Sequence, residues 1–426
     1  MTEMSRTQNH IQTVLDFLLA AVFIAMGGSM YQYIEPTKGF LGKACIALTA
    51  ICVILSFFIR KAYKDRKTFL RGIVITAIIV LYLVIFVLIK PVNVKSYIMM
   101  LLQVFALSVY VFICCGSDRI SGALIRYSQL VTVIAAASIV CWLLFSVLRA
   151  VPNSGEVQSY WVSDYEPVSI WTFYNIYFEP QWVTFFGKYI VRNCAIFTEA
   201  PIFTWHLVIA FFVELFIQKK VSFVRTIIIG LALITTVSTT GYIAGVLAVI
   251  VRIVVACLKS ERYRSLSKGA KAAIWIIAAA VVIAVAAGSI FLLKEKFASY
   301  SGSTRIEDFR VGFLGWMDNF WTGAGFGNRE RIYIHREIYS DYGFSNGIME
   351  VAAEGGVYLL ICFVGPFIYG FIDAVRRKDA ELAIFAVFVF VMASITSSQY
   401  TYLMYFLQLF MLSGIKIIGE KEKLTE

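Results

Sequence analysis

Long apolar runs separated by short polar connections dominate the chain. The runs recur at about 17–22 residues, the length that an α-helix needs to cross a bilayer. The pattern predicts twelve membrane spans at residues 13–31, 40–59, 72–89, 96–115, 127–148, 202–218, 226–238, 241–258, 273–293, 346–373, 382–396 and 399–418. The seventh run is short, so 226–258 can instead form a tilted or broken hairpin that turns at 238–241. We therefore predict an all-α fold, a polytopic transmembrane helical bundle of about twelve spans that forms a single integral membrane domain over residues 1–426.

The composition agrees with this pattern. Hydrophobic residues make up 60% of the 426 residues and charged residues 15%, whereas a soluble domain carries roughly 25% charged residues. The mean hydropathy is +0.78. No convincing small-residue cleavage site follows the apolar run from Thr13 to Met30, so we expect this run to be a span and not a cleavable signal. Only the class of polytopic helical membrane proteins fits these observations.

Basic residues concentrate in alternate connections between the predicted spans. Residues on this side include Arg6, Arg60, Lys64, Arg119, Arg126, Lys219, Arg225, Lys259, Arg262, Arg376 and Lys378. Cytoplasmic loops of membrane proteins carry an excess of lysine and arginine, so we expect this side, with both termini, to be cytoplasmic. The net charge of +11 is then a signal of topology and gives no evidence for binding to nucleic acid.

Two connections are long, and both fall on the opposite, extracytoplasmic side, at residues 149–201 and 294–345. We expect both to contain short surface helices. Long connections tend to be functional. The first outer loop is dense in aromatic residues: Tyr160, Trp161, Tyr165, Trp171, Phe173, Tyr174, Tyr177, Phe178, Trp182, Phe185 and Phe186. These rings can form an interfacial belt at the depth of the lipid headgroups, or a platform for sugar rings. Both interpretations can hold together, because a lipid-linked sugar lies at that depth.

The second outer loop is predicted to contain a short surface helix. The segment Thr304–Glu307 fits a capping box. Apolar residues then follow at helical spacing: Ile306, Phe309, Phe313, Trp316, Met317 and Phe320. We expect this apolar face to lie on the membrane or the bundle and to leave Arg305 and Asp308 toward water. Glycines at 323, 325 and 327 end the helix and permit positive φ angles. No strand precedes them, which excludes a dinucleotide-binding fold.

Three arginines on the outer side are candidates for binding a phosphate group. Arg192 lies just above the mouth of the sixth span, and Arg305 and Arg310 lie in the second outer loop. A guanidinium can hold a phosphate in a planar, bidentate way, so the three together can neutralise a diphosphate. In the alternative interpretation, Arg192 snorkels at a helix end, and the other two are solvated charges paired with nearby carboxylates.

Four residues on the outer side are candidates for handling a proton. Glu199 lies close to Arg192 in the sequence and can be a general base or the partner of that arginine. Glu350 and Glu354 share one helix face below the outer end of the tenth span. There they can orient substrate hydroxyls, accept a proton or join helices by hydrogen bonds. His335 is a further candidate base. No histidine, cysteine and carboxylate cluster has metal-site spacing, so we expect neither a bound metal nor a cofactor.

Three polar residues within the sixth and eighth spans, and one cysteine in the first outer loop, receive structural interpretations. Glu214 and Arg252 are expected at the same depth, about 18 Å below the outer surface. Equal depth predicts an ion pair between the sixth and eighth spans, with a proton or ion path as the functional alternative. His206, one turn inside the sixth span, is expected to be a packed, hydrogen-bonded histidine. Cys194, in the first outer loop, has no obvious disulfide partner there.

These segments together resemble the superfamily of O-antigen ligases and of O-antigen and capsular polysaccharide polymerases (Wzy-like proteins). Residues 192–201 are similar to its arginine-bearing segment before a span, and residues 238–241 to its polar turn between two short spans. Residues 310–325, which include Trp316, and residues 345–356, which include Asn346, are similar to its second signature. Ligases of the superfamily typically carry a histidine just before the asparagine. This chain has Ser345 there, which favours a polymerase.

The resemblance implies glycosyl transfer at the outer face of the bacterial plasma membrane. The implied donor is an undecaprenyl-diphosphate-linked oligosaccharide, and the acceptor is a sugar hydroxyl on a second lipid-linked repeat unit. A flippase that delivers the donor and a chain-length regulator are candidate partners. The alternatives are a ligase-type glycan transferase and a flippase or exporter of the same lipid-linked sugar. A flippase should concentrate its cations in a central membrane cavity, whereas these cations lie in the outer loops.

The same resemblance implies roles for the candidate residues. Cations are expected to stabilise the diphosphate leaving group, and a positioned base is expected to take the proton of the acceptor hydroxyl. We assign the catalytic cations as Arg192 and Arg310, and the candidate bases as Glu199, Glu350 and His335. The predicted substrate-binding residues are Arg305, Trp316, Ser345, Asn346 and Glu354.

Overall fold

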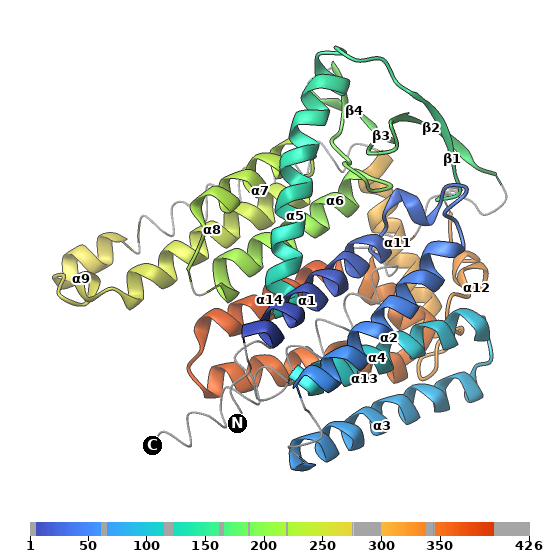
Figure 1. Cartoon of the computed structure of the whole chain (residues 1–426), viewed down its shortest axis with the longest axis horizontal. Helices are drawn as coiled ribbons and strands as arrows, with labels where there is room; N and C mark the ends of the chain where they lie inside the picture. The colour runs from blue at the N-terminus through green and yellow to red at the C-terminus, as the bar shows by residue number, and fades with distance from the viewer. Residues whose placement is uncertain are drawn as a thin grey trace.

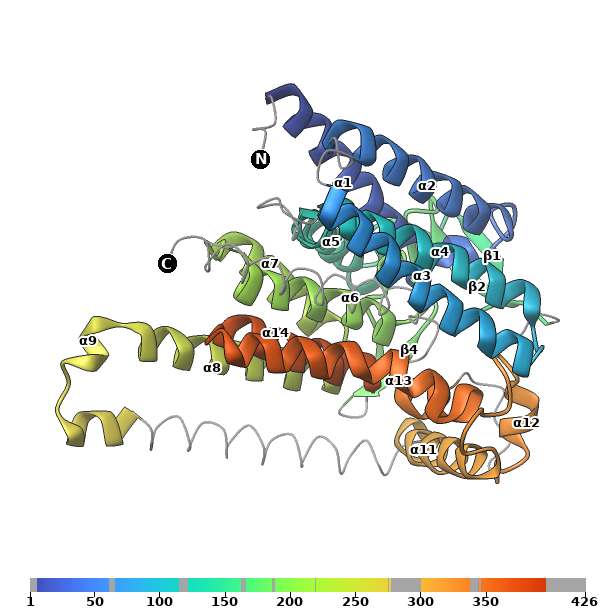
Figure 2. The ribbon, with the colours of Figure 1, turned by 90° about the horizontal axis from the view of Figure 1, so that it is seen from below.

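The protein is a bundle of long helices with short strands gathered at one end (Figure 1). The computed structural model describes residues 6–60, 66–114, 122–161, 166–185, 188–218, 220–274, 276, 300–337, 344 and 346–395. Figure 2 shows the same bundle from below, with α11 (Tyr300–Asp318) and α12 (Arg329–Tyr333) beside the start of α13 (Gly347–Arg376). The strands, α11 and α12 therefore lie near the same end of the long helices.

Eight of the described helices are long and apolar enough to cross a membrane. They are α1 (Arg6–Met26), α2 (Phe40–Arg60), α3 (Arg66–Ile89), α4 (Val94–Cys114), α5 (Gly122–Cys141), α6 (Ala200–Phe212), α8 (Thr239–Lys259) and α13 (Gly347–Arg376). Helices α5 and α6 continue as π-helical segments, Trp142–Val147 and Val213–Ile217. Two shorter apolar helices are α7 (Phe223–Thr235) and α14 (Ala380–Ser394).

The predicted polytopic helical membrane fold is confirmed. These helices correspond to the first eight predicted spans and to the tenth and eleventh. The predicted span at 399–418 and most of that at 273–293 lie outside the described residues. The seventh and eighth runs form a hairpin of a short and a long helix, α7 and α8, joined at residues 236–238.

Helix α6 lies at the centre of the bundle. It is apolar on all sides, as expected for a helix without a solvent-facing side, and 89% of its spanning segment is buried inside the protein. The corresponding buried share of α3 is 22%, so most of the apolar surface of α3 is left for lipid. His206 on α6 is fully buried and hydrogen-bonded to the Tyr127 hydroxyl and the Gly27 carbonyl oxygen, at 2.5 and 2.7 Å. The prediction of a packed histidine is confirmed.

The predicted ion pair between Glu214 and Arg252 is wrong. Glu214 pairs with Arg225 on the neighbouring α7 at 3.0 Å, and it also accepts a hydrogen bond from Ser128. Arg252 pairs with Glu381 at the start of α14. Equal depth does not bring two residues together when their helices turn those faces toward different neighbours. Cys194 is buried and free, as expected.

The first outer loop folds into two small antiparallel sheets, where we had expected short surface helices in both outer loops. Strands β1 (Gly155–Ser159), β2 (Val168–Phe173) and β3 (Tyr177–Glu179) form one sheet, with Trp171 opposite Glu179. Strands β4 (Trp182–Phe185) and β5 (Lys188–Val191) form a hairpin. Aromatic and β-branched residues favour extended strands. A bridge between Ile34 and Ser159 ties the first sheet to the connection between α1 and α2.

The second outer loop contains α11 (Tyr300–Asp318) and α12 (Arg329–Tyr333). Thr304 lies inside α11, so the predicted helix start at a capping box is wrong. The apolar face of α11 is exposed in the protein, with Ile306 58% and Phe309 50% accessible, as expected for a face that lies on lipid. Asp308, however, is fully buried. Our expectation that it faces water is wrong, because Arg336 folds back over α11 and pairs with it.

Candidate active site

Helix α13 is broken near its outer end. Gly356 adopts φ 58° and ψ −159°, which separates an outer half-helix from a longer inner one. This backbone region is essentially restricted to glycine. Asn346 caps the outer half, because its side-chain oxygen accepts a hydrogen bond from the backbone N–H of Met349 at 3.2 Å. Asn346 was predicted to bind substrate, and the structure gives it this capping contact.

The glycine-rich turn after α11 fills the break. The backbone N–H groups of Ala324 and Gly325 donate to the carbonyl oxygens of Ala353 and Glu354, both at 2.8 Å. In return, the N–H groups of residues 357 and 358 donate to the carbonyl oxygens of residues 320 and 321, both at 3.0 Å. The turn therefore satisfies backbone groups that a broken helix would leave without partners in a membrane.

The close approach of the two segments requires glycine. A Cβ atom on Gly323 would lie 2.3 Å from the backbone carbon of Glu354, and one on Gly356 would lie 2.4 Å from that of Trp321. The tip between α3 and α4 packs on the other side of the turn, where the Asn93 amide donates to the carbonyl oxygens of Phe326 and Gly327. The turn is thus clamped between α13 and the α3–α4 connection.

An arginine and a buried carboxylate meet beside this break. Nη2 of Arg329, the first residue of α12, lies 3.0 Å from Oε1 of Glu350, whose side chain is only 1% exposed. The charge of Glu350 raises the pKa of Arg329, and Glu354 one turn further along α13 adds to the effect. Glu354 is buried as well. Glu350 and Glu354 therefore face one cation, as their shared helix face predicts.

Arg310 is held by other groups of the second outer loop. Its Nε and Nη2 donate to the two carboxylate oxygens of Glu307 at 3.0 and 2.8 Å. Nη1 pairs with Glu337, and Nη2 also donates to the carbonyl oxygen of His335. The hydrogen bond from Arg310 lowers the pKa of Glu307, and the same bond raises the pKa of Arg310. This is the paired arrangement that we gave as the alternative to phosphate binding.

His335, a predicted base, is paired with Asp318. Its Nε2 lies 2.6 Å from Oδ2 of that carboxylate at the end of α11. In the next residue, Arg336, Nη2 lies 2.7 Å from Oδ1 of Asp308, and the guanidinium carbon lies 4.3 Å from the ring centre of Tyr333. Residues 335–337, which follow α12, thus form ion pairs with residues of α11.

Arg192 lies at the outer end of α6, between β5 and the helix. Its Nε donates to the carbonyl oxygen of Thr236 at 2.9 Å, and its Nη1 donates to Oε1 of Gln181 at 3.2 Å. The amide nitrogen of Gln181 donates to Glu199 at 3.2 Å. Gln181 therefore links the predicted cation and the predicted base of the first loop. Thr236 belongs to the turn between α7 and α8. Arg192 therefore connects its own segment, residues 192–201, to that turn.

Of the remaining predicted substrate-binding residues, the structure describes the side chain of Trp316. Trp316 stacks on Phe320, with ring centres 5.2 Å apart, and its indole N–H donates to the Phe320 carbonyl oxygen. Ser345 and the side chain of Arg305 lie outside the described residues. Within the described part of the chain, no group of three or more histidine, cysteine, aspartate and glutamate residues could hold a metal ion.

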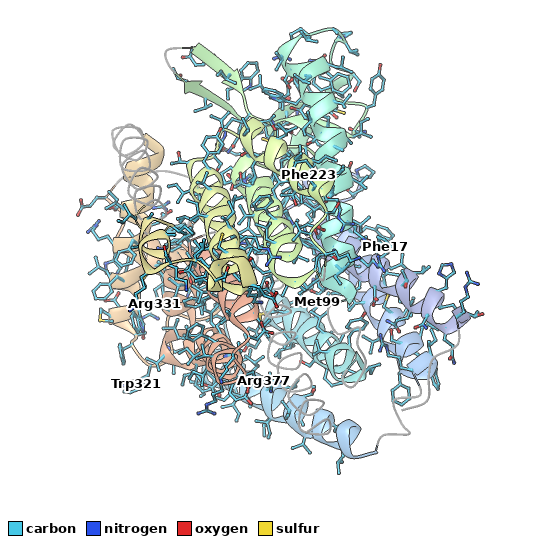
Figure 3. The ribbon with its side chains drawn as sticks, turned by 90° about the vertical axis from the view of Figure 1, so that its left-hand side faces the viewer. Phe17, Met99, Phe223, Trp321, Arg331 and Arg377 are labelled. Atoms are coloured by element: carbon cyan, nitrogen blue, oxygen red, sulfur yellow. The ribbon has the colours of Figure 1, made fainter. Side chains whose placement is uncertain are left out.

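Arg329 is the residue that sequence reasoning missed. The second-loop arginines that we selected precede the glycine-rich turn, whereas Arg329 follows it directly. The available signal was this position, a cation immediately after a turn that must approach a span. The tertiary structure brings it to Glu350, 21 residues further along the chain. Trp321 and Arg331 lie on the same flank of the molecule (Figure 3).

The described fold and these outer segments define a multi-pass helical membrane protein with a polar site at one end of the bundle. Residues 225–364 match the family model described as O-antigen ligase. The resemblance to the O-antigen ligase and Wzy-like superfamily is thus confirmed, and it supports glycan transfer of the ligase or polymerase type on a lipid-linked polysaccharide.

The matched region covers the structural elements around the broken helix. It runs from α7 into α13 and includes Arg310, Arg329, Glu350 and Glu354, whereas Arg192 lies before it. Comparison with curated proteins produced no match. Comparison with solved structures produced none either.

Proposed function

We propose that the protein is a polysaccharide repeat-unit polymerase. It transfers an undecaprenyl-diphosphate-linked glycan onto another lipid-linked repeat unit at the outer face of the plasma membrane. The family match supports glycan transfer. Ser345 in place of the histidine of ligases favours the polymerase within that family. The excess of basic residues on the opposite side supports cytoplasmic termini.

The observation that carries the proposal is the pairing of Arg329 with Glu350 at the broken helix. Of the three guanidinium nitrogens of Arg329, Nη2 alone has a hydrogen-bond partner among the described residues. The Arg329 side chain is 43% exposed. The buried carboxylate holds the guanidinium beside the break and leaves Nε and Nη1 available. A guanidinium presented in this way can bind a phosphate oxygen, because its fork of donors matches that geometry.

The proposed reaction is a displacement at the anomeric carbon of the donor. The hydroxyl oxygen of the acceptor sugar forms a bond to that carbon, and the bond from the carbon to the diphosphate oxygen breaks. The diphosphate leaves with the bonding electron pair, and a carboxylate takes the hydroxyl proton. Arg329 stabilises the charge on the leaving group, Arg192 assists from the first outer loop, and Glu354 or Glu199 takes the proton.

The test is the size distribution of surface glycans from a deletion strain of the source organism complemented with defined variants. We expect wild type to restore long polymer and Arg329→Ala to leave single repeat units. Arg329→Lys should restore part of the yield, because it keeps the charge and loses the bidentate fork. Arg331→Ala is the matched control, since Arg331 is an exposed arginine on the same short helix. It should behave as wild type.

Other outcomes identify the alternatives. Long polymer that stays lipid-linked in the deletion strain indicates a ligase-type transferase. Repeat units that accumulate on the cytoplasmic face indicate a flippase. Full polymer length and yield in both Arg329→Ala and Arg192→Ala would refute the assignment of these arginines to the diphosphate.

A further inference from the structure

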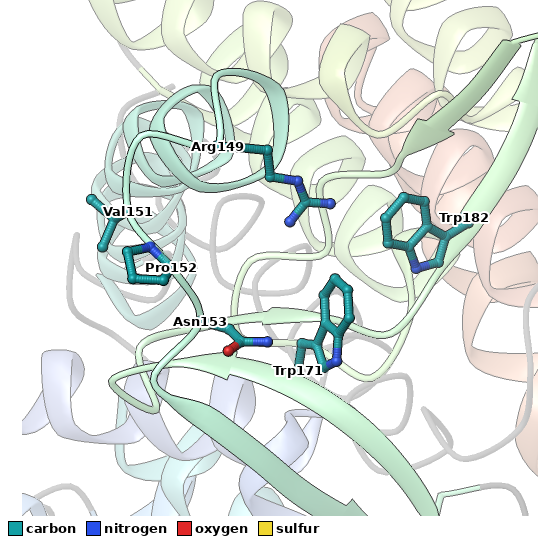
Figure 4. A pocket seen from close by; sticks show the side chains of 6 residues that line it. All are labelled: Arg149, Val151, Pro152, Asn153, Trp171 and Trp182. Atoms are coloured by element: carbon teal, nitrogen blue, oxygen red, sulfur yellow. The ribbon is translucent and has the colours of Figure 1, made fainter.

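An open cavity of about 400 Å³ lies in the first outer loop, just beyond the outer end of α5. It is separate from the broken helix and includes none of the predicted site residues. Its lining residues are Arg149, Val151, Pro152, Asn153, Trp171 and Trp182. In Figure 4 the guanidinium of Arg149 and the amide of Asn153 point into the space that the two indole rings border.

The two tryptophans present accessible rings around one cation. Their ring centres lie 6.2 Å apart with an interplanar angle of 80°. The guanidinium carbon of Arg149 lies 5.6 Å from the ring centre of Trp171 and 5.4 Å from that of Trp182. Trp171 is 40% exposed and Trp182 49% exposed. The cavity therefore combines aromatic surface with hydrogen-bond donors.

Buried partners hold these groups in place. Nη1 of Arg149 donates to both carboxylate oxygens of Glu179 at 3.0 Å, and Glu179 is buried and also accepts from Ser146 at 2.7 Å. The indole N–H of Trp171 donates to Glu156 at 3.1 Å. The carboxylate of Glu179 neutralises the guanidinium, so the cavity offers N–H donors without excess positive charge. Such a site is arranged before a ligand arrives, which lowers the entropic cost of binding.

We propose that this cavity binds one uncharged pyranose ring of the glycan. The apolar C–H face of a sugar ring packs on an indole, and ring hydroxyls accept hydrogen bonds from Arg149 and Asn153. The neutralised arginine favours an uncharged sugar over an acidic one. The cavity volume lies within the range of small-molecule sites. The proposal rests on the glycan transfer proposed above and names the sugar class that the first outer loop recognises.

The cavity is connected to Arg192 through the β4–β5 hairpin. Trp182 pairs with Val191, the residue before Arg192, and the backbone N–H of Arg192 donates to the carbonyl oxygen of Gln181 at 3.1 Å. Neighbouring residues in an extended chain point to opposite faces. The indole of Trp182 therefore lies on one face and the Gln181 amide, which contacts Arg192, on the other. A sugar in the cavity is held by the same hairpin that positions this arginine.

The test is saturation-transfer NMR on the full-length protein in lipid nanodiscs. The probes are methyl glucoside, galactoside, mannoside and N-acetylglucosaminide, with methyl glucuronide as the charged member. We expect a signal from at least one neutral hexoside. Trp182→Ala and Trp171→Ala should weaken its binding about fivefold to tenfold, and Trp182→Phe should restore part of it. Tyr189→Ala is the matched control, because Tyr189 is an 81% exposed ring on the same hairpin outside the cavity.

The outcomes separate this proposal from the polymerase. Absence of signal from every hexoside, or equal signals from Trp182→Ala and Tyr189→Ala, overturns the sugar site. Stronger binding of the glucuronide overturns the choice of an uncharged ring. The assay uses no lipid-linked donor and measures no polymer. A protein that binds hexosides through Trp182 but forms no polymer in cells would therefore refute the polymerase and leave the sugar site standing.

Discussion

Replacement of Gly356 by alanine should destabilise the outer half of α13 and the glycine-rich turn. Two independent features of the structure predict this result. Gly356 adopts φ 58° and ψ −159°, and a non-glycine residue held in such a region costs about 1–3 kcal/mol. A Cβ atom would also lie 2.4 Å from the backbone carbon of Trp321 and 2.5 Å from the backbone nitrogen of Thr322. Relief of this clash by movement of the backbone costs about 1–3 kcal/mol more.

The expected loss is therefore about 2–6 kcal/mol, the sum of these two costs. The backbone hydrogen bonds between residues 320–325 and 353–358 are the contacts most directly affected, and each contributes about 1 kcal/mol. We expect a lower melting temperature in detergent and faster hydrogen exchange of the amides at 324, 325, 357 and 358. Under the proposed polymerase function, polymer yield should fall as well, because the same break positions Glu350.

Gly230→Ala is the matched control. Gly230 lies in α7, and a Cβ atom there would meet nothing within 4 Å. Alanine in a helix is favoured over glycine by about 0.5–1 kcal/mol, so this variant should melt at or above the wild-type temperature. If Gly356→Ala has the same melting temperature as Gly230→Ala, and its amides at 324, 325, 357 and 358 keep their protection from hydrogen exchange, the reasoning from backbone geometry is wrong.

Three further predictions concern contacts of the outer end and the core. Arg310 lowers the pKa of Glu307 below its ordinary 4.5, so this pair stabilises the fold above that value and loses its effect as pH falls through the lower folded pKa. Arg310→Met should remove this pH dependence from melting curves recorded from neutral pH to below 4.5, and an unchanged dependence would contradict the assignment. Asn93→Ala should cost about 1–3 kcal/mol, through two lost hydrogen bonds and a positive φ of 46°, and Asn93→Gly should cost less. Gly27→Ala places a Cβ atom 2.5 Å from the His206 ring, so thermal denaturation should show a loss of about 2–4 kcal/mol, and wild-type stability would refute the tight contact.

Local sequence features determined most of the helical architecture. A segment that crosses lipid must satisfy its own backbone hydrogen bonds, so a sufficiently long apolar run forms a helix whatever its neighbours are. This explains why α2 and α8 lie close to their predicted ranges, 40–59 and 241–258. The strands of the first outer loop were not predicted, because short strands depend on partners elsewhere in the loop. Glu350 and Glu354 share one face because helical spacing alone places them there.

Only the tertiary structure decided which charged groups meet. The sequence left Arg310 with two interpretations, binding of a diphosphate or pairing with nearby carboxylates. In the fold it contacts Glu307, Glu337 and a backbone carbonyl. Arg329 was not selected, yet folding of the glycine-rich turn onto α13 brings it to Glu350. The physical reason is that hydropathy and spacing specify where a residue lies along its own helix. The partner of that residue depends on how helices rotate and pack against one another, and those contacts join residues far apart in the chain.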